Sequence, residues 1–144
     1  MTTEPSPTRR EVMTYMATCN PVFQVMGMEV IEAVPGRSRL AMVVRPDMAN
    51  TFGSCHGGVI FTLADMSFGW TCNGANEKAV TAGATIDIVG PAMVGDRLIA
   101  DVVEAYRAGR NALYDVRITV AETGAEVALV RGRMRIVGGK VMEV

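Results

Sequence analysis

Residues 50–65 are NTFGSCHGGVIFTLAD, and this stretch decides how the rest of the chain is interpreted. A glycine-rich loop leads into a helix that we expect from Gly57 to about Asn73. The expected helix is apolar on nearly every side, which is typical of a helix buried in a protein core. One acid, Asp65, interrupts the apolar run, and acids are rarely buried without a partner. Asp65 is therefore either a structural carboxylate held by a nearby donor or a functional group.

Two glycines at the start of this helix leave its first N–H groups unshielded by side chains. These N–H groups have no partner within the helix, and the helix dipole places partial positive charge there. The helix start at Gly57 and Gly58 is therefore suited to an anion or a developing oxyanion. The alternative is that the glycines only allow the loop to turn sharply.

The motif made by Asn50, Ser54–Gly58 and Phe61–Asp65 resembles that of the hotdog-fold acyl-CoA thioesterases. Within them it is most similar to the PaaI-like branch of phenylacetic acid degradation, and the likeness covers about Cys19 to Gly139. The resemblance implies an α+β hotdog fold, with a curled antiparallel sheet wrapped around one long central helix. It also implies that the catalytic residues are Asn50, Gly57 and Asp65.

Composition sets limits on the kind of protein. A length of 144 residues suits one domain with its own core, and 49% hydrophobic residues is ordinary for a globular protein. The net charge of −1 gives no field that would recruit nucleic acid or an anionic membrane. No apolar run approaches the roughly 20 residues that span a bilayer, and residues 1–10 do not resemble a secretory signal. We therefore expect a cytoplasmic protein with no nucleic-acid or membrane partner.

The three cysteines, Cys19, Cys55 and Cys72, are odd in number and show no CxxC spacing. They predict neither a disulfide framework nor a zinc site, and they fit a reducing compartment. We expect no metal and no cofactor, because coenzyme A is part of the substrate. Cys55 could act as a thiol nucleophile only with a basic partner, for which the adjacent His56 is a candidate.

The predicted order of elements is a short helix, two strands, the long helix and then three or four strands. Thr8 and Glu11 have the spacing of a capping box at the start of the first helix. An antiparallel sheet needs one face covered, and the long helix can supply that cover. The remaining sheet surface favours pairing with a second copy, and the resemblance implies a homodimer or homotetramer. We expect helices at 8–18 and 57–73, and strands at 28–34, 39–44, 80–89, 96–105, 113–121 and 126–137. The chain then divides into a tail with a short helix (1–20), the hotdog domain (21–139) and a C-terminal tail (140–144).

Gly57 and Asp65 are eight residues apart on one helix, a separation of about 12 Å along the axis. Both an oxyanion donor and a base must lie within hydrogen-bonding reach of the same thioester. One helix cannot easily place both groups there, whereas a second, antiparallel copy can. We therefore expect composite sites, with Gly57 and Asn50 from one subunit and Asp65 from its partner.

Three further residues of the motif have a predicted supporting role: His56, Gly58 and Thr62. His56 is the only histidine, and its position just before the helix favours fixing the loop over direct proton transfer. Thr62 lies three residues before Asp65 on the helix surface, although it could equally be a core hydroxyl bonded to the backbone. Asn50 has a structural alternative as well, as an Asx-turn residue.

Arg131, Arg133 and Arg135 alternate along the last predicted strand and so share one face of it. Such a stripe is usually the solvated face of a sheet. Arginines also suit the phosphates of coenzyme A, so Arg131 and Arg133 are candidates for that contact. Arg110 and Asn111, in a predicted turn, are rival candidates.

The sequence thus favours an acyl-CoA thioesterase with Asp65 as general base or nucleophile and the Gly57 helix start as the oxyanion site. The resemblance favours phenylacetyl-CoA or hydroxyphenylacetyl-CoA, while medium-chain acyl groups stay open. One alternative is a hotdog hydroxyacyl-thioester dehydratase, although the His-Phe-Pro type loop of those enzymes is missing. Another is a non-catalytic acyl-CoA-binding sensor.

Overall fold

The computed structural model describes residues 5–143, so residues 1–4 of the predicted tail and residue 144 lie outside the described part. Helix α1 spans Arg9–Cys19, and Thr8 caps it. The Thr8 hydroxyl accepts the Glu11 N–H at 3.3 Å, and the Glu11 carboxylate accepts the Thr8 N–H at 2.7 Å. The predicted capping box is therefore confirmed. A second, short helix, α2 (Pro21–Val25), is absent from the predicted order of elements; Asn20 caps it and proline occupies its first position.

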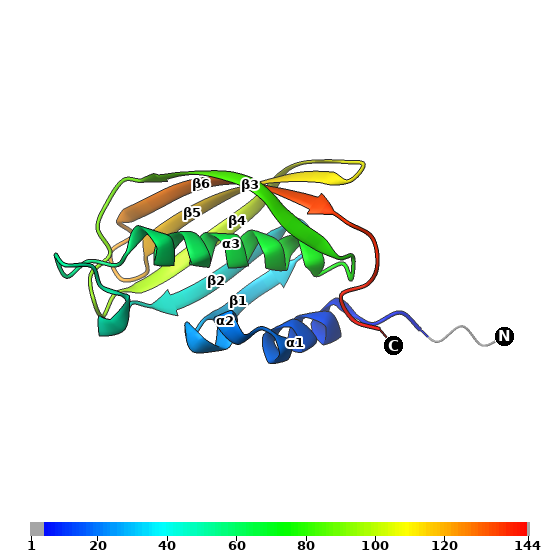
Figure 1. The fold of residues 1–144 in the computed structure, drawn as a ribbon, viewed down its shortest axis with the longest axis horizontal. Coiled ribbons are helices and arrows are strands. Elements are labelled where there is room, and N and C mark those ends of the chain that lie inside the picture. Colours follow the sequence, from blue (N-terminus) through cyan, green and yellow to red (C-terminus); the bar gives the residue numbers. More distant parts are fainter. Residues whose placement is uncertain (1–4, 144) are drawn as a thin grey trace.

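Six strands form one antiparallel sheet in the order β1-β2-β4-β5-β6-β3 (Figure 1). Strand β3 directly follows the long helix in sequence, yet it pairs with the last strand, β6. This pairing places β3 at one edge of the sheet and β1 at the other. The strands are β1 (Glu29–Val34), β2 (Arg37–Val43), β3 (Ala79–Ile88), β4 (Arg97–Ala108), β5 (Asn111–Val120) and β6 (Glu126–Ile136).

The long helix α3 (Gly57–Asn73) lies across one face of the curled sheet, and its bounds are those predicted (Figure 1). A short 3-10 helix, η1 (Pro46–Met48), precedes the loop that leads into it. The core between α3 and the sheet is apolar, and Leu63, Phe68 and Trp70 are at most 1% exposed. The structure thus has the predicted architecture of one central helix inside a curled antiparallel sheet. None of the helices among residues 5–143 is long and apolar enough to cross a membrane.

Two features fix how α3 sits on the sheet. A Cβ atom at Gly132 of β6 would lie 2.5 Å from the Phe68 ring, so a glycine is needed for this close approach. On the other side, the buried Ser38 hydroxyl of β2 hydrogen-bonds the Thr71 hydroxyl and donates to the Ser67 carbonyl at 3.3 Å. Because these contacts fix both the height and the rotation of α3, they also fix the direction in which Asp65 faces.

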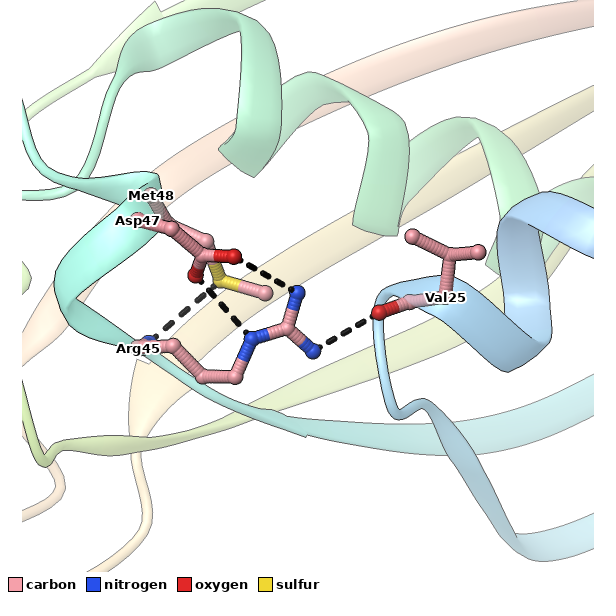
Figure 2. Close-up of polar contacts among 4 residues, drawn as sticks. All are labelled: Val25, Arg45, Asp47 and Met48. Carbon is pink, nitrogen blue, oxygen red and sulfur yellow. Dashed lines mark hydrogen bonds and ion pairs between the residues drawn. The ribbon is translucent and has the colours of Figure 1, made fainter.

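The N-terminal helices pack beside α3. The Phe23 ring of α2 lies 4.8 Å from the Trp70 ring, measured between centroids. Arg45 ties α2 to the loop ahead of α3, because its guanidinium donates to the Val25 carbonyl at 2.7 Å and pairs with Asp47 at 3.0 Å (Figure 2). The position of α2 is therefore coupled to the segment that begins the central helix.

Candidate active site

Asp65 is half-buried in the middle of α3 and opens onto a groove of about 420 Å³. One wall of this groove comes from α1 and α2, and the other comes from β3 and β6. The Thr81 hydroxyl of β3 donates to Asp65 Oδ1 at 2.5 Å. Asp65 forms no ion pair with any residue between 5 and 143. The carboxylate is therefore oriented by a neutral donor and is not neutralised by a cation.

Thr81 is the site residue that the sequence interpretation missed. It faces inward from β3, opposite the buried Met134 of β6, and the inward residues further along β3 include Ile86 and Ile88. A polar residue on an otherwise apolar inward face is a usable signal. The signal was hidden because a bulge between Thr81 and Gly83 breaks the alternation of the strand.

The start of α3 lies at the other end of the helix from this groove. A Cβ at Gly57 would come within 2.9 Å of the tip of the half-exposed Ile88 side chain, so a larger residue there would require that side chain to shift. A Cβ at Gly58 would meet nothing within 4 Å, and its φ is ordinary, so neither packing nor backbone shape demands glycine at that position. His56 precedes α3 without any side-chain cap. The helix start is thus open, as an oxyanion site requires.

Asn50 is placed in the tight loop ahead of α3. Its side-chain oxygen accepts the N–H groups of Phe52 and Ser54, at 2.9 and 3.1 Å, and its amide donates to the Ser54 hydroxyl at 2.9 Å. This is the Asx-turn arrangement that the sequence left open as its alternative. In the single chain the Asn50 amide therefore shapes the loop and does not reach Asp65.

His56 and Cys55 do not form the arrangement of a nucleophilic pair. The His56 imidazole is exposed, and the Cys55 thiol donates to the His56 carbonyl at 3.7 Å. Burial raises the pKa of the Cys55 thiol, whereas a thiol nucleophile needs a lowered one. The structure thus disfavours Cys55 as the nucleophile.

Thr62 lies in the same groove as Asp65. Its hydroxyl donates to the Gly58 carbonyl at 2.8 Å, one turn earlier on α3. This bond matches the predicted alternative of a hydroxyl satisfied by the backbone. Of the residues named from sequence, the groove therefore gathers Asp65 and Thr62, while Asn50, His56, Gly57 and Gly58 gather at the helix start.

The candidate phosphate-binding arginines lie on the outer face of the sheet, away from α3. Arg131 makes a bidentate pair with Asp115, at 2.5 and 2.9 Å, and Arg133 donates to the Ala82 carbonyl at 3.2 Å. Asn111 accepts from Arg135 at 3.5 Å. The Arg110 side chain, in the exposed turn between β4 and β5, forms no ion pair among residues 5–143.

The part of the chain that the structure describes contains no set of ligands for a metal ion. No three His, Cys, Asp or Glu side chains cluster there in a way that could hold a metal ion. The polar side chains that line the groove are the Asp65 carboxylate, the hydroxyls of Thr62 and Thr81, and the amides of Asn20 and Asn73.

The sequence profile of the thioesterase superfamily matches residues 52–128. Among known proteins, acyl-coenzyme A thioesterase PaaI of Escherichia coli is 34% identical over 118 residues, which are 82% of this chain and 84% of that protein. The residues matched by the profile, 52–128, include the end of the loop, the central helix α3 and strand β3.

Solved structures show the same fold. The E. coli PaaI protein from the phenylacetic acid degradation operon superimposes with a TM-score of 0.88 at 30% identity, covering 92% of this chain and 95% of that one. A Streptococcus mutans protein bound to acetyl CoA gives a TM-score of 0.75 at 26% identity, covering 78% and 90%. The curled sheet and central helix are thus the hotdog architecture predicted from sequence.

Proposed function

This chain belongs to the thioesterase superfamily and is an acyl-CoA thioesterase, and from that premise we propose that arylacetyl-CoA thioesters are its substrates. Phenylacetyl-CoA and hydroxyphenylacetyl-CoA are the first candidates. The support is the likeness to PaaI of the phenylacetic acid degradation operon, at 34% identity in sequence and a TM-score of 0.88. The products are the free acid and coenzyme A.

Asp65 carries the proposed chemistry. The observation behind this assignment is a half-buried carboxylate on the central helix, held by Thr81 at 2.5 Å and opening onto a groove. As a general base it takes a proton from water while the water oxygen attacks the thioester carbonyl, after which the C–S bond breaks, CoA leaves as the thiolate and the carboxylate gives up its proton. As a nucleophile it attacks the carbonyl itself, CoA leaves as the thiolate, and water then hydrolyses the mixed anhydride. Both routes end at the same products.

The proposed oxyanion site is the open start of α3 at Gly57, with Asn50 beside it. The separation of about 12 Å between Gly57 and Asp65 favours a site shared between two subunits. Strand β3 supports such pairing, because it is an unpaired edge on which Val80 is 49% and Ile88 is 51% exposed. The enzyme is then a homodimer, or a homotetramer built from such dimers.

The remaining motif residues have supporting roles in this proposal. Gly58 keeps the helix start accessible, His56 fixes the loop, and Thr62 borders the groove beside Asp65. Phosphates of coenzyme A are contacted by Arg110, Asn111, Arg131 and Arg133, of which Arg110 has no ion pair to give up in the described chain. We place the enzyme in the cytoplasm, a compartment that suits its three free cysteines.

A panel of acyl-CoA substrates assayed for free CoA tests the activity and its acyl preference together. We expect kcat/KM to be highest for arylacetyl groups and the reaction to need no added metal. A higher kcat/KM for medium-chain acyl-CoA would change the assigned substrate but leave the assignment as a thioester hydrolase intact. No release of thiol from any acyl-CoA would favour a dehydratase or a sensor, since neither one frees CoA.

Subunit mixing tests the shared site. If Asp65 and Asn50 come from different subunits, equal amounts of Asp65→Ala and Asn50→Ala exchange into about half mixed dimers, each with one sound site. About a quarter of wild-type activity then returns, assuming independent sites and two-fold symmetry. If both residues come from one subunit, every site keeps one defect and nothing returns. Native mass spectrometry shows whether subunits have exchanged, which makes an inactive mixture decisive against the shared site.

A further inference from the structure

The central helix contains a glycine that the fold does not explain. Gly69 lies deep inside α3, where glycine is a much poorer helix former than alanine. Its φ is not in the left-handed region, and a Cβ built on it would meet nothing within 4 Å. Gly57 and Gly132 differ in this respect, because an added Cβ would come within 2.9 Å of Ile88 and 2.5 Å of Phe68 respectively. Neither dihedral angle nor packing within the chain therefore requires glycine at residue 69.

The empty space beside Gly69 belongs to the groove that holds Asp65. Gly69 follows Asp65 by four residues, so both lie on one side of α3, about 6 Å apart along its axis. The groove continues one turn further to Asn73. The Asn73 amide donates to the carbonyls of Gly69 and Ala79 and accepts the Ala79 N–H at 2.8 Å. Asn73 is thus held firmly where the groove ends.

Large apolar side chains flank Gly69 on both sides of the groove. Met16 and Val22 contribute from the N-terminal helices, Met134 contributes from β6, and Met66 lies on α3 itself. Flexible methionines adapt to irregular apolar ligands. A glycine among them leaves a cleft whose floor is helix backbone. The volume of about 420 Å³ is within the range of small-molecule sites.

We propose that Gly69 sets the acyl specificity of the enzyme, because its missing side chain leaves room for an acyl group larger than acetyl. The inference rests on the proposed role of Asp65. With the thioester carbonyl at Asp65, the acyl group extends along α3 towards Asn73 and passes over Gly69. A side chain at residue 69 would narrow this path and leave Asp65, Thr81 and the helix start unsubstituted. Gly69 is a specificity-determining residue and takes no part in the chemistry.

The test compares Gly69→Ala and Gly69→Leu with wild type on acetyl-CoA, phenylacetyl-CoA and octanoyl-CoA. We expect kcat/KM for acetyl-CoA to stay within about threefold, while that for the two larger substrates falls by about 10–200-fold in Gly69→Leu. Gly69→Ala should show a smaller loss of the same selectivity. Val25→Leu is the matched control, since it enlarges a 68%-exposed side chain of α2 outside the groove.

Thermal unfolding separates this role from a packing role in the dimer. Alanine is the better helix former, so Gly69→Ala should raise Tm by about 2–4 °C and leave the dimer intact in native mass spectrometry. A lower Tm or a lost dimer would mean that a partner subunit packs against Gly69, which would overturn the inference.

The kinetic outcomes are equally decisive. An equal loss on all three substrates, or no loss in Gly69→Leu, would also overturn the role of Gly69 while leaving the thioesterase intact. A wild-type enzyme that accepts only acetyl-CoA would refute the open acyl path. If wild type cleaved no acyl-CoA, the proposed function would fail first. Quenching of the fluorescence of Trp70, the only tryptophan and a groove residue, by phenylacetyl-CoA would then still show whether Gly69→Leu blocks the groove.

Discussion

Two hollows lie on opposite faces of the sheet, and the larger is not the candidate active site. The outer hollow, of about 930 Å³, is lined by three arginines and three aspartates, among them Asp101, Asp115 and Arg131. The inner groove, of about 420 Å³, contains Asp65 and mostly apolar neighbours. Size alone would therefore select the face opposite the candidate active site.

The carboxylates of the two hollows differ in their partners. Asp115 is held by Arg131 and Asp101 by Arg39, with distances of 2.5 and 2.7 Å. Among residues 5–143, Asp65 receives only the neutral Thr81 hydroxyl. A carboxylate matched by a guanidinium is a weak base and a poor nucleophile, whereas one without a cation keeps its electron pairs available. The partner of the acid, more than the volume around it, indicates where the chemistry occurs.

Replacing one acid in each hollow should give the largest contrast. We expect Asp65→Asn to lower kcat by about 10²–10⁴-fold, because it removes a positioned base or nucleophile while keeping the shape. Asp115→Asn should leave kcat within about twofold, because Asp115 lies on the outer face of the sheet, away from Asp65. Any effect through its partner Arg131, a proposed contact of the coenzyme A phosphates, should appear in KM. Steady-state release of CoA measures both, with circular dichroism as the check on folding. Near-normal turnover by folded Asp65→Asn, or a dead Asp115→Asn, would reverse the assignment of the two hollows.

Thr81 offers a sharper comparison within the inner groove. A hydrogen bond to a charged group contributes about 1.5–3 kcal/mol, so Thr81→Val should lower kcat by about 10–100-fold with KM little changed. Thr81→Ser keeps the hydroxyl and should restore most of the rate. If Ser and Val variants were equally slow, packing of the threonine methyl group would matter more than its hydroxyl.

The smallest effect is expected for the ion pair of the outer face. The Arg131 guanidinium beside Asp115 holds the pKa of that carboxyl below its usual value. A lowered folded pKa means that the pair stabilises the protein above pH about 4 and loses this effect as pH falls through the folded value. Both side chains are about half exposed, so Asp115→Asn should lower Tm by no more than about 3 °C at pH 7. The difference from wild type should shrink as the pH falls below about 4, and it should shrink in high salt. A larger loss that persists in acid would show that Asp115 does more than pair with Arg131.

Local signals in the sequence were enough to predict the six strands and the helices α1 and α3. The Gly57-Gly58 start and the Asn73-Gly74 end bracket α3, and the structure confirms both bounds. Strand β5 begins at Asn111, two residues before its prediction, because Ala108 and Asn111 pair directly across a two-residue turn with Gly109 at φ +57°. The strand order could not be predicted in the same way. Pairing of β3 with β6 joins segments about 50 residues apart, and no local pattern records it.

The residues of the candidate site also differ in whether local sequence is enough to predict them. Asp65 was predictable because a lone acid in an apolar helix is conspicuous. Thr81 was not, because only the folded chain brings β3 against α3, and the bulge after Thr81 hides its inward direction. The short helix α2 was also underestimated, although Asn20 and Pro21 form a recognisable helix start. Residues whose role depends on contacts between elements are those that the sequence left unassigned.

The placement of β3 directly after α3 has a consequence for inheritance. One uninterrupted stretch of chain, residues 50–81, contains most parts of the candidate site. These are the loop, the start of α3, Asp65, the cleft floor at Gly69 and the Thr81 donor. The apolar walls formed by Met16, Val22 and Met134 are encoded outside it. A single recombined segment between two genes of this fold would therefore carry the proposed catalytic groups and the room left by Gly69 into a new host together. Only the apolar walls of the groove would then be inherited separately.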